Sequence, residues 1–449
     1  MRHAGMAVLA AGVLVGAAAG VRGPGAGARP ESLTPHRAAI FAVSKTKPVA
    51  YDGYVVEVPA GWPVYRLAAA PRRCVRYDTH AVYLGAPGPD QQCPAHLVGR
   101  TEAVRIDSAG TGRVAAAGAG ALARDSAAHE LRLTLAGTAG DRPAWVAATR
   151  QSLSITATYG DDPAMAERIV SSAHAATAPT SLVSLAVPAS PGPAKARGAA
   201  RAGGAARAGG AARPAKVFAH GPIAGFDTCT APSMRAMRAW RRAYAAVGVY
   251  IGGVNRACDA GNLSRRWVRR VKAMGWWLIP TYVGLQPPCD RDYARIKPRR
   301  ASAEGRAAAD DAVTQARSLG LRRHAPIYAD MEAYNNTKRR CRRAVLAFLD
   351  SWTRRLRARG YVPGVYSSAA SGVEDLGNAT SVGGHPLARP KSIWFALWDG
   401  RRNVKGAPYL ARTWWPGERR IKQFRGARWQ KHGGFRLNID IDRVFGAVD

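Results

Sequence analysis

Strand-like and helix-like segments alternate through the C-terminal half of the chain, and this alternation most restricts how it can fold. Apolar runs predict strands at 223–227, 247–252, 277–283, 325–331 and 362–366. Amphipathic stretches between and after them predict helices that end near residues 246, 274, 319 and 359. Repeated βα units of this length require a parallel sheet, and their number predicts an α/β fold of the (β/α) TIM-barrel type. Later strands lack full helices between them, so we expect degenerate later repeats, with strands at 393–398, 421–424 and 435–441.

Residues 188–216 divide the chain into two parts. The segment consists largely of Ala, Gly, Pro and Arg, with little apolar bulk to bury, which predicts a disordered, cationic linker. Residues 44–177 predict a small α+β domain, with strands at 54–58 and 131–135 and helices at 143–153 and 163–173. This domain shows no catalytic pattern, so a binding or targeting module is the default interpretation. The barrel is expected over residues 217–449.

Carboxylates occur at the predicted carboxyl ends of the barrel strands, the face on which barrel active sites are built. Asp227 ends the first strand, and Asp440 and Asp442 end the last. Asp330 and Glu332 end the fourth strand and share one face of it, because side chains two residues apart point the same way. Glycoside hydrolysis needs two neighbouring carboxylates. A strand that runs out into an acidic, solvated loop is the alternative interpretation of this motif.

Aromatic side chains lie near the same predicted strand ends. Flat rings with polar edges suit stacking on sugars, and several rings at one rim predict a binding groove, although any one such ring is more often a core residue. The predicted substrate-binding residues are Tyr250, Tyr282, Tyr328, Trp394, Trp398 and Asp442.

The chain has six cysteines, an even number that suggests disulfides in an exported protein, with buried free thiols as the alternative. The linker separates the first two from the other four, which favours Cys74–Cys93. Adjacency of the predicted barrel loops favours the pairs Cys229–Cys258 and Cys289–Cys341. Since no Cys/His cluster has zinc-like spacing, we expect no metal ion and no cofactor.

The N-terminus indicates export. A short basic head precedes an apolar stretch at 6–21, and a small-x-small site ends at Ala28, so residues 1–28 are predicted to be a cleaved signal peptide. An uncleaved N-terminal anchor is the alternative. The formal charge of +36 predicts binding to polyanions. For a secreted protein the expected partner is a cell-wall glycan or another anionic envelope polymer, with no nucleic acid and no stable membrane span after cleavage.

Four motifs occur in the order seen in family 25 lysozyme-like glycoside hydrolases: Gly-Phe-Asp at 225–227, Tyr-Ala-Asp-Met-Glu at 328–332, Trp-Phe-Ala-Leu-Trp at 394–398 and Ile-Asp-Ile-Asp-Arg-Val-Phe at 439–445. The stretch from about residue 217 resembles more closely a glycoside-hydrolase-like domain of secreted proteins from high-GC Gram-positive bacteria. The segments 225–232, 250–253 and 279–284 are particularly similar to that domain.

The resemblance implies a barrel that cleaves the β-1,4 link between N-acetylmuramic acid and N-acetylglucosamine. It implies that Glu332 is the general acid and that Asp330 orients the substrate or stabilises an oxocarbenium-like transition state. Asp227 and Asp440 would complete an acidic floor. Donation by Glu332 requires this residue to be protonated while Asp330 stays ionised.

The sequence therefore predicts a secreted, cell-wall-associated glycosidase that acts on peptidoglycan or a related envelope glycan. The alternative, from another functional class, is a non-catalytic carbohydrate-binding protein that retains the barrel groove.

Overall fold

A computed structural model describes residues 45–109, 122–126, 128–135, 152–160, 162–176 and 221–449. Lys45–Asp449 forms one compact unit. The predicted signal peptide at 1–28 and linker at 188–216 lie outside the described residues, as does most of the predicted helix at 143–153. Among the helices that are described, none is long and apolar enough to cross a membrane.

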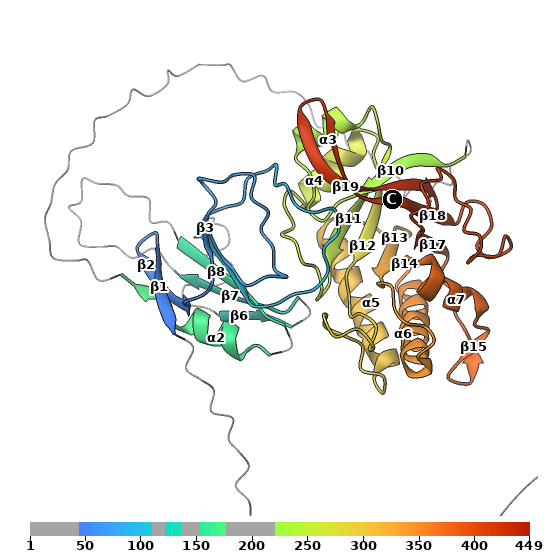
Figure 1. Cartoon of the computed structure of the whole chain (residues 1–449), viewed down its shortest axis with the longest axis horizontal. Helices are drawn as coiled ribbons and strands as arrows, with labels where there is room; N and C mark the ends of the chain where they lie inside the picture. The colour runs from blue at the N-terminus through green and yellow to red at the C-terminus, as the bar shows by residue number, and fades with distance from the viewer. Residues whose placement is uncertain (1–44, 110–121, 127, 136–151, 161, 177–220) are drawn as a thin grey trace, which may run out of the picture. The chain divides into compact units, whose positions relative to one another are not determined.

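Eight strands close into a barrel, as the alternation of segments predicts (Figure 1). In barrel order they are β10 (Ile223–Asp227), β11 (Ala246–Gly252), β12 (Trp277–Tyr282), β13 (Pro326–Asp330), β14 (Val362–Ser368), β17 (Ser392–Ala396), β18 (Arg420–His432) and β19 (Phe435–Phe445). Consecutive strands from β10 to β18 pair in parallel.

The closing strand departs from the predicted all-parallel barrel, because β19 pairs antiparallel with both β18 and β10. Only Gly433 and Gly434 separate β18 from β19, and both have positive φ. A two-residue turn of this conformation joins antiparallel strands, whereas a parallel connection needs a crossover of a dozen or more residues.

Helices connect the early strands. They are α3 (Met234–Trp240), α4 (Arg265–Ala273), α5 (Ala301–Ser318) and α6 (Arg339–Ala358), of which α5 and α6 lie side by side (Figure 1). Ser264 caps α4, because its hydroxyl accepts a hydrogen bond from the Trp267 amide at 3.2 Å. Helix α3 is shorter than predicted, since β11 already begins at Ala246.

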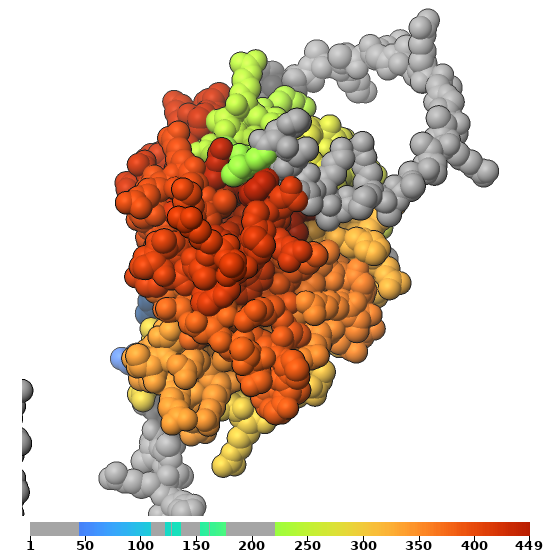
Figure 2. Space-filling model, turned by 90° about the vertical axis from the view of Figure 1, so that its right-hand side faces the viewer, coloured from blue at the N-terminus to red at the C-terminus, as the bar shows by residue number. Residues whose placement is uncertain are grey.

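The later part of the barrel carries short elements in place of long helices. These are a π-helical turn (Ala369–Val373), α7 (Glu374–Asn378), and the two-residue strands β15 (Ser381–Val382) and β16 (His385–Pro386). Figure 2 shows a face on which the later part of the chain, coloured orange to red, covers most of the surface. The predicted degeneracy of the later repeats agrees with this arrangement.

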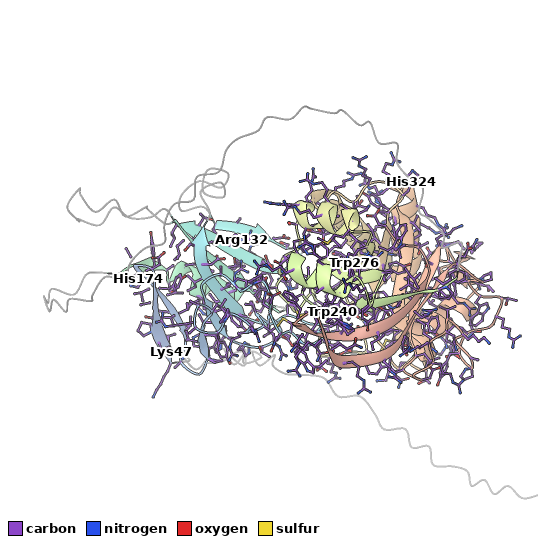
Figure 3. The ribbon with its side chains drawn as sticks, turned by 90° about the horizontal axis from the view of Figure 1, so that it is seen from above. Lys47, Arg132, His174, Trp240, Trp276 and His324 are labelled. Carbon is purple, nitrogen blue, oxygen red and sulfur yellow. A yellow bond between two sulfur atoms is a disulfide. The ribbon has the colours of Figure 1, made fainter. Side chains whose placement is uncertain are left out.

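Apolar side chains fill both sides of the barrel wall. On the outer side, Phe226 packs against Trp240 and Trp276, both labelled in Figure 3, with ring centroids 5.1 and 5.8 Å away. On the inner side, Tyr328 and Trp394 belong to a separate buried cluster. Burial on both faces explains why the early strands are continuous apolar runs.

The described part of the N-terminal region contains two sheets and one helix. Strands β1 (Thr46–Tyr51), β2 (Tyr54–Pro59) and β9 (His174–Ala175) form one sheet. The second sheet has the order β3 (Val64–Arg66), β4 (Val82–Leu84), β5 (Ala103–Ala109), β8 (Ser152–Thr158), β7 (Glu130–Leu135) and β6 (Leu122–Asp125), and α2 spans Ala164–Ser171. The predicted helix at 143–153 is wrong at its end, because Ser152 and Leu153 pair with β5 in strand β8.

Candidate functional site

Pairing of β10 with β19 brings the first and last acidic motifs together. The antiparallel register places Asp227 opposite Asp440 and Gly225 opposite Asp442. Asp227, Asp440 and Asp442 are each at most 1% exposed. The prediction that Asp440 and Asp442 end the last strand is wrong, because both lie in the middle of a strand that runs opposite to the others.

A glycine in β11 provides the room for this cluster. Gly248 pairs with Asp227 across the two strands. A Cβ atom at Gly248 would lie 2.5 Å from the Asp227 Cβ atom and 3.2 Å from the Trp394 ring. Because such contacts are too short for any larger side chain, the position of Asp227 depends on this glycine.

Gln423 in β18 links the carboxylates to the aromatic residues. Its side-chain amide donates hydrogen bonds to Asp227 Oδ2 at 3.0 Å and to Asp440 Oδ2 at 3.2 Å. Its carbonyl oxygen accepts from the Tyr366 hydroxyl at 3.1 Å and from Trp398 Nε1 at 3.0 Å. We did not predict Gln423 as a site residue, since a single glutamine in a strand carries no recognisable motif.

The second acidic motif lies at the end of β13. Asp330 is the last residue of the strand and is 2% exposed, whereas the Glu332 side chain beyond it is 23% exposed. The buried Gln286 side chain donates to the Asp330 carbonyl at 2.9 Å and accepts from the Glu332 amide at 2.8 Å. Gln286 therefore holds the backbone that carries both carboxylates, another role that the sequence did not reveal.

A histidine from the N-terminal region completes the cluster. His96 Nε2 lies 2.8 Å from Glu332 Oε1, and His96 Nδ1 lies 2.6 Å from the Tyr250 hydroxyl oxygen. Ligand atoms of His96, Asp227 and Asp440 also lie within 4.8 Å of one another. No local pattern in the sequence marks His96, which precedes Glu332 by 236 positions.

Residues 93–101, which we call the His96 segment, are anchored on the barrel loop that follows β11. Val98 forms an antiparallel bridge with Arg256, and the Gly99 amide donates to the Asn255 carbonyl at 2.8 Å. The Arg100 guanidinium donates to the Arg256 carbonyl at 2.9 Å. Backbone pairing of this kind places the His96 ring among the carboxylates.

Burial and mutual repulsion make the aspartates hard to ionise. Burial, together with the Asp440 charge, raises the pKa of Asp227 to about 7. Burial also raises the pKa of Asp440, and it raises those of Asp330 and Asp442 well above the ordinary value, with added repulsion from Glu332 and Asp227 respectively. The aspartates of this cluster therefore keep their protons to a higher pH than a solvent-exposed aspartate.

His96 reverses the predicted protonation of the two acids on β13. Burial opposes the charge of the imidazole, but the Glu332 carboxylate raises the pKa of His96 well above its ordinary value. Burial likewise opposes ionisation of Glu332, but the charge and hydrogen bond of His96 lower the pKa of Glu332. We predicted a protonated Glu332 beside an ionised Asp330. The structure favours an ionised Glu332 beside a protonated Asp330. The prediction was wrong because the sequence gave no indication that a cation, His96, lies next to Glu332.

Only some of the predicted substrate-binding residues are accessible. The Trp398 side chain is exposed, with Gly426 packed against its indole ring. Tyr250 contacts His96 within the site. Inside the barrel, Trp394 Nε1 donates a hydrogen bond to Asp442 Oδ1 at 2.9 Å, and both residues are at most 1% exposed. Their predicted contact with substrate is wrong for this structure, because the barrel interior encloses them.

Tyr282 and Tyr328 are also structural residues, contrary to prediction. The Tyr282 hydroxyl donates to Asp311 of helix α5 at 2.7 Å, so it faces the outer helical layer. The fully buried Tyr328 hydroxyl lies within hydrogen-bonding distance of Ser392 Oγ and of the Ala447 carbonyl, both at 2.8 Å. Alternation along a strand predicts which residues share a face, but it does not decide which face points into a site.

All three predicted disulfides are confirmed: Cys74–Cys93, Cys229–Cys258 and Cys289–Cys341. The second joins the loops that follow β10 and β11, beside the anchored His96 segment. Cys93, at the start of that segment, accepts a hydrogen bond on its sulfur from the Thr230 hydroxyl at 3.2 Å. Two disulfides thus brace the region from which His96 enters the acidic cluster.

The family model of the Rv2525c-like, glycoside hydrolase-like domain matches residues 238–444. This part of the chain is therefore similar to the Rv2525c-like, glycoside hydrolase-like domain. The relation predicted from the motifs is confirmed. No curated protein sequence matches the chain.

Among solved structures, the domain is similar to an uncharacterized B. stearothermophilus protein, at 20% identity over 51% of this chain and 96% of that one, with a TM-score of 0.34. The Mycobacterium tuberculosis Tat-secreted protein Rv2525c is 16% identical over 51% of this chain and 98% of that one, with a TM-score of 0.34. A family 25 glycosyl hydrolase from Bacillus anthracis is 14% identical over 53% of this chain and 95% of that one, with a TM-score of 0.30.

The site also offers the residue types that bind cations. Ligand atoms of His96, Asp330 and Glu332 lie within 4.8 Å of one another. Both ring nitrogens of His96 are already hydrogen-bonded, however, to Glu332 and Tyr250. A protonated imidazole therefore supplies positive charge where a metal ion would otherwise lie, and we assign no metal to the domain.

Proposed function

We propose that this protein is a glycosidase that cleaves a β-1,4-linked glycan of the cell envelope, of the peptidoglycan class, with Glu332 as the general acid. The observation that carries the proposal is the convergence of Glu332 with Asp227, Asp330 and Asp440 at one end of a glycoside hydrolase-like barrel. Paired carboxyl groups are what glycosidic cleavage requires.

Accessibility supports Glu332 as the proton donor. The aspartates of the cluster are at most 2% exposed, whereas about a quarter of the Glu332 side chain is open to solvent. Among these groups Glu332 is therefore the one that is open to the leaving oxygen of a bound sugar, while the aspartates, once ionised, would stabilise positive charge that develops on the sugar ring. Trp398 offers an exposed ring for stacking on a neighbouring sugar.

The proposed place of action is outside the cytoplasm, in association with the cell wall. Three disulfides suit an oxidising compartment, and the predicted signal peptide at 1–28 would direct export. The formal charge of +36 suits attraction to an anionic envelope polymer. In this proposal residues 44–177 form an accessory module joined by the 188–216 linker to the catalytic barrel.

Replacement of Glu332 tests the proposal. Glu332→Gln keeps the shape of the side chain and removes the transferable proton, so release of reducing sugar from purified peptidoglycan should fall at least about a hundredfold. Binding of the glycan should change little. Glu418→Gln, which alters an exposed glutamate outside the site, is the matched control and should retain the wild-type rate.

The comparison should be run from acidic to neutral pH, in the wild-type chain and in a His96→Ala background. Equal release by the Glu332 variant and its parent would contradict the role of Glu332. Glycan binding without release in every variant would instead support the non-catalytic alternative.

A further inference from the structure

His96 lies where the proposed reaction would develop positive charge. Cleavage of a glycosidic bond passes through an oxocarbenium-like transition state, and carboxylates around the sugar stabilise its charge. The Glu332 carboxylate is hydrogen-bonded to His96, and ligand atoms of Asp227 and Asp440 lie within 4.8 Å of it. The groups expected to surround a cationic sugar therefore surround an imidazole.

We propose that His96 is a built-in inhibitor of the glycoside hydrolase-like domain, whose imidazolium takes the place of the cationic sugar and holds Glu332 as a carboxylate. This inference rests on the proposed function, since it concerns the same site. It assigns an inhibitory role to the N-terminal region, beyond the accessory role proposed above.

Two effects follow from the geometry. First, a sugar must displace His96 before it can reach the carboxylates, because His96 Nε2 is within hydrogen-bonding distance of Glu332. Second, Glu332 cannot donate a proton while it is ionised, and the imidazolium lowers the pKa of Glu332 against the opposing effect of burial. Inhibition thus acts on both binding and proton transfer.

The contact is supported from several sides. The Tyr250 hydroxyl is hydrogen-bonded to His96 Nδ1 at 2.6 Å, and this contact orients His96 Nε2 toward Glu332. Outside the site, Arg105 forms an ion pair with Asp259 at 2.5 Å, and Asn262 donates to the Pro89 carbonyl at 2.8 Å. These contacts join the N-terminal region to the barrel rim and hold the His96 segment in place.

The test compares full-length wild type with His96→Ala and His96→Gln. His80→Ala is the matched control, because His80 is an exposed histidine of the N-terminal region near a glutamate, with Nδ1 3.7 Å from Glu102. One assay follows release of reducing sugar from peptidoglycan. A second measures affinity for an N-acetylglucosamine oligomer by calorimetry, which does not depend on turnover.

We expect His96→Ala to raise the rate or the oligomer affinity about ten- to a hundredfold, the effect of losing one charge-assisted hydrogen bond. His96→Gln keeps a polar side chain without the charge and should give a smaller increase, whereas His80→Ala should match wild type. Adding Glu332→Gln to His96→Ala should abolish hydrolysis and keep the tighter binding.

Failure of this inference can be told apart from failure of the proposed function. Suppose that wild type hydrolyses the glycan, and that His96→Ala does so at an equal or lower rate with unchanged oligomer affinity. This result overturns the inhibitory role and leaves the glycosidase standing. Tighter oligomer binding by His96→Ala without hydrolysis in any variant supports occlusion and overturns the glycosidase. If no variant hydrolyses the glycan and His96→Ala leaves the oligomer affinity unchanged, both the inhibitory role and the glycosidase are overturned.

Melting curves would confirm that each variant is folded. If His96→Ala does not fold, Tyr250→Phe provides a second route, because it removes the hydroxyl that orients the imidazole. Tyr250→Phe should also raise the hydrolysis rate or the oligomer affinity. An unchanged rate and affinity would count against the inference.

Discussion

Replacing Asp227 by asparagine is expected to stabilise the protein near neutral pH and to have little effect in acid. Asp227 is 1% exposed and faces Asp440 across the strand pair, so its carboxylate is both desolvated and repelled. Asparagine has a similar shape and carries no charge. Its side-chain oxygen can still accept the hydrogen bond that Gln423 donates to Asp227 Oδ2.

The sign and size of the effect follow from the pKa of Asp227, which rises from 3.8 to about 7 on folding through burial and the Asp440 charge. Below about pH 3.8 the group is protonated in both states and does not affect stability. As the pH rises toward 7, the unfolded chain releases this proton while the folded chain keeps it, so folding becomes less favourable. Well above pH 7 the group is ionised in both the folded and the unfolded state, and the loss of stability reaches its full size. Because a pKa difference of one corresponds to about 1.4 kcal/mol, the full cost is about 4 kcal/mol.

Urea unfolding of wild type and Asp227→Asn, at about pH 4 and about pH 8, measures this difference. The free energies of unfolding should be similar at the lower pH, and the variant should be more stable at the higher pH by up to about 4 kcal/mol. Asp310→Asn is a control of opposite sign. Burial opposes ionisation of Asp310, but hydrogen bonds from Arg355 and Arg359 lower its pKa, so its replacement should destabilise the protein at neutral pH.

A gain in stability that is the same at both pH values would refute the electrostatic argument, since a packing change does not depend on protonation. A wild type that is more stable than Asp227→Asn at the higher pH would refute it as well. In that case the carboxylate must be satisfied by contacts that outweigh burial and repulsion.

Two further predictions concern the rim of the barrel. Trp398→Ala should weaken binding of N-acetylglucosamine oligomers about fivefold, as expected for one lost ring contact, without a change in melting temperature, because Trp398 is 63% exposed. Trp429→Ala, which alters another exposed tryptophan, should leave calorimetric affinity unchanged, and equal losses in both variants would argue against a specific stacking site. Replacing Cys229 and Cys258 together by alanine should lower the free energy of unfolding by about 2–4 kcal/mol, measured by urea unfolding. No loss would show that the remaining contacts of these loops already constrain the chain.

The local sequence pattern was sufficient to predict most of the helices and strands of the barrel. Strand β10 begins and ends as predicted, and helices α5 and α6 end within about one residue of their predicted ends. These elements carry strong periodic signals, and their caps and turns act over a few residues, so short-range propensity decides them. The two barrel disulfides, Cys229–Cys258 and Cys289–Cys341, followed from the same pattern, because consecutive βα loops are neighbours on one rim.

Local pattern failed where distant strands had to be paired. It identified Asp440 as part of the site but gave the wrong direction for β19, so it missed that Asp440 lies directly opposite Asp227. It also predicted a substrate-binding role for Tyr328, although the Tyr328 hydroxyl is hydrogen-bonded to Ser392 and Ala447 in the barrel interior. Register and burial depend on which strands become neighbours, and alternation within one strand does not contain that information.

The sequence by itself determined the kinds of groups in the site: the carboxylates on β10, β13 and β19, and the exposed tryptophan that follows β17. Only the tertiary structure decided their charge states. His96 reaches Glu332 because backbone bonds anchor residues 93–101 beside Asn255 and Arg256, far away in the sequence. A pKa depends on burial and on charges a few ångströms away, so the acid–base character of Glu332 is set by a contact that no local motif records.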